Sequence, residues 1–238
     1  MNSKIILCAA LASSAALFGC SKEVTSSVNI RTPGLAPIIT VTAESASLAT
    51  VHVDMKIAGS SSNAYVILEG GDKLVAEADG KTSDMRSESE GEYEAEFPTA
   101  AADTEFKVML ERPNDDPGLN NRGTMPAPFE IGALPETKPS RATADVTVTW
   151  SPVDTNSDMK IQVNGSCIFL ETFSVPGDEG QFVIPKGKLS STNSEKPEEC
   201  EVTVTMTRSR VGTTDSIFDK ESSFTLQQIR KDTFVSAP

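Results

Sequence analysis

Apolar and polar residues alternate with a period of two along most of the chain. In six segments every second residue is apolar, and the residues between are mainly charged or carry hydroxyl or amide groups: 51–57, 93–97, 106–110, 146–150, 159–163 and 202–206. Successive side chains of a β-strand point to opposite faces, so this pattern predicts antiparallel strands with one buried and one solvated face. No segment shows a convincing helical period.

Five short matches recur in the same order in the two halves of the chain. The pairs are 40–42 with 147–149, 54–57 with 158–161, 91–98 with 180–185, 105–112 with 201–208, and 129–131 with 224–226. Five matches in order indicate the duplication of a module of about 100 residues. Residues 134–141 lie between the copies, and Pro135 and Pro139 favour an extended, stiff linker there.

About 100 residues with roughly seven short alternating strands and no helix fit an immunoglobulin-like β-sandwich. We therefore predict an all-β chain with two tandem immunoglobulin-like antiparallel β-sandwiches, one over 36–133 and one over 142–238. Cys167, Cys200 and Trp150 resemble the immunoglobulin pattern of two core cysteines and a tryptophan. Because Trp150 precedes both cysteines instead of lying between them, we predict a sandwich and not a true immunoglobulin domain.

The amino-terminal residues predict export. Lys4 precedes an apolar run over 5–18, which is too short for a transmembrane helix of about 20 residues and matches a secretory signal. The run closes with Leu17, Phe18, Gly19 and Cys20. This ending resembles the lipobox of bacterial lipoproteins, although Phe18 stands where a smaller residue is commonest. An ordinary secretory signal with an incidental cysteine is the alternative.

The lipobox resemblance implies that residues 1–19 are a signal peptide and that the Cys20 thiol receives a diacylglyceryl group before cleavage. Acylation of the new amino terminus would add a further fatty chain, such as palmitate, and two or more chains anchor a protein stably. Ser21 follows the lipidated position, which in Gram-negative lipoproteins points to the outer membrane. The periplasmic and the surface face both stay open. Residues 20–35 are polar and turn-rich, which predicts a flexible tether spanning roughly 20 Å.

Charge and cysteine content limit the partners. The chain carries 34 acidic against 21 basic residues, a balance that repels nucleic acid and anionic lipid headgroups. The expected partners are the membrane, through the lipid, and an unknown envelope protein or polymer. Cys167 and Cys200 form an even pair in an oxidising compartment, which predicts a disulfide. A zinc site is disfavoured because His52 is the only histidine.

Catalytic signals are mostly missing from the sequence. His52 falls on the polar face of its strand, and the chain contains neither a G-x-S-x-G elbow nor an H-E-x-x-H motif. Carboxylate-pair chemistry needs no histidine, but Glu92, Glu94 and Glu96 read as a solvated strand face. We therefore expect no catalytic residue and no cofactor.

Two long loops, 113–128 and 209–222, occupy corresponding places in the two copies, and Arg112 and Arg208 open them. Long loops without secondary structure are often functional, which makes these loops a candidate partner surface. The residues assigned to this surface are Arg112, Asp115, Asp116 and Arg208. A long surface hairpin without a ligand is the alternative. Calcium binding through residues 114–121 is weaker, because the spacing fits no EF-hand and the same residues are typical of turns.

These observations predict a membrane-anchored envelope lipoprotein that acts as a non-catalytic binding or scaffolding module. A hydrolase, or an accessory subunit of one, acting through carboxylates or calcium is the alternative.

Overall fold

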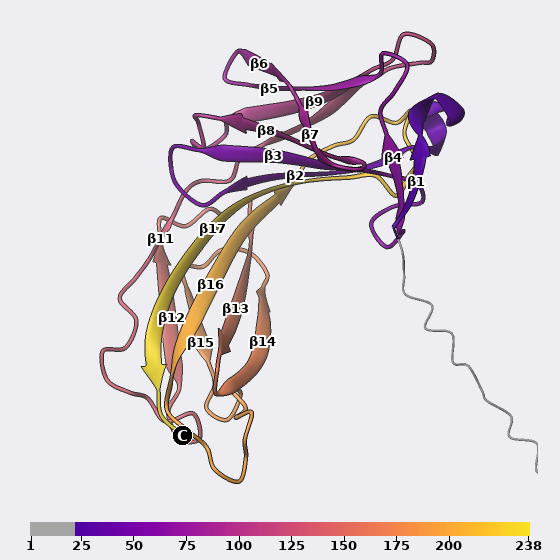
Figure 1. The fold of residues 1–238 in the computed structure, drawn as a ribbon. Coiled ribbons are helices and arrows are strands. Elements are labelled where there is room, and N and C mark those ends of the chain that lie inside the picture. The colour runs from indigo at the N-terminus through magenta and orange to yellow at the C-terminus, as the bar shows by residue number, and fades with distance from the viewer. Residues whose placement is uncertain (1–21) are drawn as a thin grey trace, which may run out of the picture.

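The computed structural model describes residues 22–238, which fold into two β-sandwiches joined end to end (Figure 1). The predicted all-β class with two immunoglobulin-like sandwiches is confirmed. The predicted signal peptide and the lipidation site at Cys20 lie outside the described residues. Within residues 22–238, no helix has the length and hydrophobicity that a membrane span requires.

The first sandwich packs two sheets face to face. One sheet contains β2 (Ala36–Ala43), β3 (Ala49–Lys56), β8 (Glu92–Phe97) and β7 (Arg86–Ser89), and β4 (Ala64–Ile67) and β1 (Glu23–Ser26) extend it. The other contains β10 (Gly118–Thr124), β9 (Glu105–Glu111), β5 (Lys73–Ala78) and β6 (Lys81–Asp84). The predicted alternation sets the core, because Val51, Val53, Phe106, Val108 and Leu110 all point between the sheets and are fully buried.

The second sandwich is built in the same way from fewer strands. A three-stranded sheet of β11 (Glu130–Ile131), β12 (Val146–Ser151) and β15 (Gln181–Ile184) faces β14 (Ile168–Val175), β13 (Asp158–Gly165), β16 (Cys200–Val211) and β17 (Ser223–Ser236). Its separate core contains Val148, Trp150, Ile161, Val204 and Phe234. Each sandwich therefore has its own hydrophobic core.

The hairpin of β16 and β17 runs through both sandwiches (Figure 1). Its outer part supplies Val202, Val204 and Phe234 to the second core, whereas Phe224 and Leu226 lie in the first core. The first half of β17 also pairs in parallel with β2, so one ten-stranded sheet crosses the junction. The expected assignment of all of 142–238 to the second sandwich is therefore wrong for the segment around Phe218, Phe224 and Leu226. The expected boundaries at 133 and 141 are also wrong, because Phe129, β11 and, in the predicted linker, Leu134 all pack in the second sandwich.

The residues expected to form a flexible tether are folded from Lys22 onward. Strand β1 pairs in parallel with β4, and two 3₁₀ turns follow at Ser27–Asn29 and Thr32–Gly34. Ser27, Thr32 and Leu35 have no exposed surface. The prediction failed because composition reports that a segment is polar, whereas long-range hydrogen bonds to the sandwich decide whether it is fixed.

The strand pairing tests the register of the internal repeat. β3 and β12 are the middle strands of comparable sheets, as are β5 and β13 of the facing sheets. The matches 91–98 with 180–185 and 105–112 with 201–208 fall on strands in corresponding places, β8 with β15 and β9 with β16. The other three matches fall on strands that do not correspond: 40–42 with 147–149 joins β2 to β12, 54–57 with 158–161 joins β3 to β13, and 129–131 with 224–226 joins β11 to β17. These three matches therefore do not support the predicted duplication.

The junction between the sandwiches is held by polar contacts, some of them buried. The Arg210 guanidinium lies 2.6 Å from Asp103 of the first sandwich and 2.8 Å from Asp154 of the second. The fully buried Gln228 donates to the carbonyls of Ala100 and Pro126 at 2.8 and 3.2 Å. These contacts and the shared β16–β17 hairpin connect the two sandwiches directly and fix their relative orientation.

Candidate functional site

Arg112 closes the amino-terminal end of the first sandwich from the inside. Its guanidinium donates to Asp72 at 2.9 Å, to the Ser27 carbonyl at 2.7 Å and to the Ile30 carbonyl at 3.0 Å. The side chains of Arg112 and Asp72 are each only 3 % exposed. A guanidinium carries five donors in a fixed fork, and here it clamps the segment that enters the sandwich.

Arg208 does the same at the second sandwich. Its guanidinium lies 2.6 Å from Asp178, and both side chains are fully buried. It also donates to the carbonyls of Ala127 and Pro152, and Trp150 donates its indole N–H to Asp178. The clamp therefore fixes the entry to the second sandwich and the end of β12.

Arg112, the residue directly after β9, and Arg208 of β16 occupy corresponding positions in the two sandwiches. The expectation that they form an exposed partner surface is wrong. Both guanidinium groups are buried and form ion pairs with aspartates inside the protein. Asp115 also faces inward, accepting from the Thr32 N–H at 3.0 Å and from Arg31 at 3.2 Å. Only Asp116 of the four assigned residues is exposed.

The two long loops pack on each other in the first sandwich and not at corresponding ends of two sandwiches. Part of the first loop is strand β10, paired with β9. Asp215 of the second loop accepts from the backbone N–H groups of Leu119 and Asn120, both at 3.0 Å. Phe218 covers Gly118, where a Cβ atom would lie 2.2 Å from the Phe218 ring. This contact explains why glycine stands at that position.

Asp215 makes the contact between the loops sensitive to acid. Burial favours its neutral form, but the N–H donors of Ile217, Asn120 and Leu119 outweigh burial and lower the pKa of Asp215 below its usual value. Because the pKa of Asp215 is lower in the folded than in the unfolded protein, its ionised form stabilises the folded state. This contribution is fully present above the unfolded pKa of about 3.9, and it is lost as the pH falls through the folded pKa.

We therefore expect the amide hydrogens of Leu119 and Asn120 to lose protection against exchange as the pH falls below about 4. Hydrogen exchange corrected for the intrinsic rate at each pH measures this loss. Asp215→Asn keeps an acceptor but cannot titrate, so its protection at these amides should not depend on pH. Identical pH profiles for the two proteins would show that Asp215 is not the titrating group.

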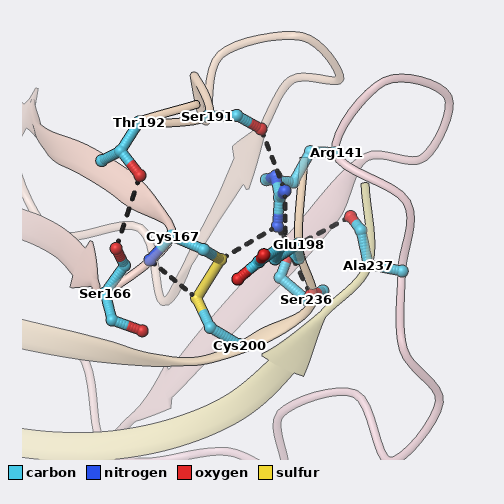
Figure 2. The surroundings of a disulfide bond; sticks show 9 residues. All are labelled: Arg141, Ser166, Cys167, Ser191, Thr192, Glu198, Cys200, Ser236 and Ala237. Carbon is cyan, nitrogen blue, oxygen red and sulfur yellow. Dashed lines mark hydrogen bonds between the residues drawn. A yellow bond between two sulfur atoms is a disulfide. The ribbon is translucent and has the colours of Figure 1, made fainter. Parts of the chain in front are cut away.

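The predicted disulfide between Cys167 and Cys200 is confirmed, and it lies at the far end of the second sandwich. Figure 2 shows the Arg141 side chain reaching toward it between the ends of several segments. Arg141 donates to Cys167 Sγ at 3.3 Å, to Ser191 Oγ at 3.0 Å and to the Glu198 carbonyl at 2.9 Å. Burial lowers the pKa of the Arg141 guanidinium from its usual value. The bridge and Arg141 together pin the loop that precedes β16.

The residues considered for catalysis are not brought together. His52 Nε2 lies 3.1 Å from Asp54, and its side chain is 39 % exposed on the outer sheet face. A hydrogen bond from Lys22 lowers the pKa of Glu92, whereas a general acid needs a raised one. Across residues 22–238, no cluster of three or more His, Cys, Asp or Glu side chains is arranged to hold a metal ion. The Asp115 carboxylate that calcium would need is already saturated by N–H donors.

Strand β14 is a candidate site that sequence reasoning missed. It is the last strand of the ten-stranded sheet and pairs with β13 alone among the named strands. Its first two residues also contact the segment 190–192, because Ile168 forms a bridge with Ser191 and the Phe169 N–H donates to the Ser190 carbonyl at 3.0 Å. The open part of the edge therefore begins at Leu170. Its register shifts between Ile168 and Glu171, so two residues, Phe169 and Leu170, lie opposite one residue of β13. Phe169 is 57 % and Leu170 62 % exposed. The run of three bulky residues from Ile168 to Leu170 breaks the period-two pattern and is the signal that could have revealed it.

No protein-family model matches the chain, and no curated protein matches it. Among solved structures, it is similar to a cytokine receptor complex with 14 % identity, covering 82 % of this chain and 94 % of that chain at a TM-score of 0.31. It is also similar to a segment of two fibronectin type-III domains from chicken tenascin. There the identity is 12 %, the coverage is 85 % of this chain and 99 % of that chain, and the TM-score is 0.25. The assignment of the fold rests on the strand pairing described above.

Proposed function

We propose that the protein is a lipid-anchored lipoprotein of the bacterial outer membrane that binds an envelope protein through the open edge of the second sandwich. The lipobox ending at Cys20 supports the anchor, and Ser21 supports the outer membrane. The role is non-catalytic binding or scaffolding. The open edge replaces the loop surface around Arg112 and Arg208 as the place where the partner binds.

The exposed strand β14 is the observation that carries this proposal. An edge strand presents unpaired N–H and C=O groups, and natural proteins usually protect such edges with charges or prolines. The strand Ile168–Val175 contains one charged residue, Glu171, and no proline. An extended segment of a partner would pair with the open part of this edge, from Leu170 onward, by strand addition, and contacts with the exposed Phe169 and Leu170 side chains would provide selectivity.

The junction between the sandwiches supports a scaffolding role. The ten-stranded sheet begins at β1 in the first sandwich and ends at β14 in the second. Because β16 and β17 cross the junction without a break, the position of β14 relative to the first sandwich is fixed. A binding edge held rigidly on an anchored body places its partner at a defined distance from the anchor.

The test is crosslinking in the native host from a photo-reactive amino acid placed at Leu170. We expect one envelope protein to be crosslinked, and expect a matched probe at Val211, which is 86 % exposed but lies at the junction, to give none. Leu170→Asp, with the probe moved to Thr172, should abolish the product by adding a charge to the edge. Equal products from Leu170 and Val211 would contradict the assignment of the edge.

A further inference from the structure

The first described residues are fixed to one edge of the first sandwich. Lys22 Nζ lies 2.9 Å from Glu92, 3.2 Å from Ser89 Oγ and 4.0 Å above the centre of the Tyr65 ring. The Glu23 N–H donates to the Asn63 carbonyl at 3.0 Å, and β1 continues in parallel register with β4. Further along, Arg112 holds the Ser27 carbonyl. The chain is therefore docked from its first described residue onward.

This docking leaves almost no length of chain between the sandwich and the predicted lipid. Cys20 stands two residues before Lys22, and two residues of fully extended chain span at most about 7 Å. A flexible tether over 20–35 would have allowed roughly 20 Å. A lipid on Cys20 therefore brings the Lys22 edge of the first sandwich to the headgroup region itself.

The segment that precedes and includes β4, beside Lys22, carries less charge than the neighbouring hairpin of β7 and β8, where Glu88, Glu90 and Glu92 lie. Residues 55–68 contain Lys56 as their only charged residue, and Ser60, Ser61 and Asn63 are exposed. Lys56 Nζ lies 4.6 Å from the Tyr65 ring centre, so the ring has two ammonium groups near it. Tyrosine and lysine are residues that membrane proteins place at the headgroup level, because each joins an apolar part to a polar end.

We infer that the edge formed by Lys22, Tyr65 and the loop 59–63 lies against the lipid headgroups and sets the orientation of the whole protein. We call this edge the anchor face, and the inference rests on the proposed lipidation of Cys20. β1 and β14 stand at the two ends of the strand order of the ten-stranded sheet, β1 in the first sandwich and β14 in the second (Figure 1). With the anchor face of the first sandwich on the membrane, the binding edge β14 lies on the other sandwich, where a partner outside the membrane can reach it.

The orientation is tested with the lipidated full-length protein in vesicles that contain a nitroxide-labelled phospholipid headgroup. A fluorophore is attached through Ser61→Cys on the anchor face or, as the matched control, through Thr172→Cys on β14. We expect strong quenching of the label at position 61 and little at position 172. Inserting about ten Gly and Ser residues between Ser21 and Lys22 should reduce the quenching at position 61 by more than half, because the insert adds a flexible span.

Mass spectrometry of the amino-terminal peptide and vesicle flotation separate this inference from the function on which it rests. A protein without acyl chains on residue 20, or one that Cys20→Ala does not release from membranes, overturns both. An acylated, membrane-bound protein whose two labels are quenched equally overturns the orientation and leaves the anchor standing. An insertion that does not change the quenching at position 61 also overturns the orientation and leaves the anchor standing.

Discussion

Replacing Arg208 with methionine is expected to destabilise the second sandwich by about 3–5 kcal/mol, because the Asp178 carboxylate would remain buried without its partner. Asp178 and Arg208 have no exposed side-chain surface, and the carbonyls of Ala127 and Pro152 would lose their donor as well. Urea unfolding followed by tryptophan fluorescence measures the change in free energy. Trp150 is the only tryptophan in the chain and lies in the second core, so its signal reports the sandwich in question.

Two matched variants identify the cause of this loss. Removing both charges, with Arg208→Met and Asp178→Asn, should cost less than Arg208→Met alone, since no charge is then buried unpaired. The ion pair of Arg31 with Asp115 provides the contrast: the Arg31 side chain is 80 % exposed and Asp115 keeps its contact with Arg112, so Arg31→Met should change stability by less than about 1 kcal/mol. If the double variant is as unstable as the single one, the packing of the arginine and not its charge holds the sandwich together.

The alternation of apolar and polar residues was sufficient to predict the all-β class and most of the core. Val51, Val53, Phe106, Val204 and Met206 are buried as the pattern indicates, because a period of two fixes which face of a strand is apolar. The pattern cannot say which strands are neighbours. Phe224 and Leu226 therefore were assigned to the second sandwich although they complete the core of the first.

The site was less predictable than the fold for a physical reason. A charged residue at the start of a loop reads as exposed, and sequence does not show that buried carbonyls will gather around it. Arg112 and Arg208 became internal clamps because several backbone acceptors and one aspartate meet at each of them. The arginine that recurs in the two halves thus marks how each sandwich is held together and not a ligand site.

The same argument applies to the candidate edge. Exposed Phe169 and Leu170 lie in a strand whose neighbours are known only once the sheet order is known. In the first sandwich the strand that corresponds to β14 is β6, which pairs with β5 alone and is polar, whereas β14 exposes Phe169 and Leu170. Only comparison of the two sandwiches in space shows this difference between corresponding edges.

Removing the disulfide by Cys167→Ala with Cys200→Ala is expected to destabilise the second sandwich by about 4 kcal/mol in the chain-entropy model. The two cysteines are 33 residues apart, so the bridge closes a long loop and removes many conformations from the unfolded chain. The second core has 17 buried hydrophobic residues against 24 in the first, which makes this sandwich the more dependent on a covalent bond. Trp150 fluorescence during urea unfolding again gives the free energy.

The control for this prediction is chemical reduction of the otherwise unchanged chain. Reduced protein and the double alanine variant should unfold at similar urea concentrations, and adding reductant to the variant should change nothing. Arg141 keeps its bonds to Ser191 and Glu198 in both, so a shared loss of stability belongs to the bridge and not to the guanidinium. A loss below about 1 kcal/mol would mean that residual structure already restricts this loop in the unfolded ensemble, against the chain-entropy explanation.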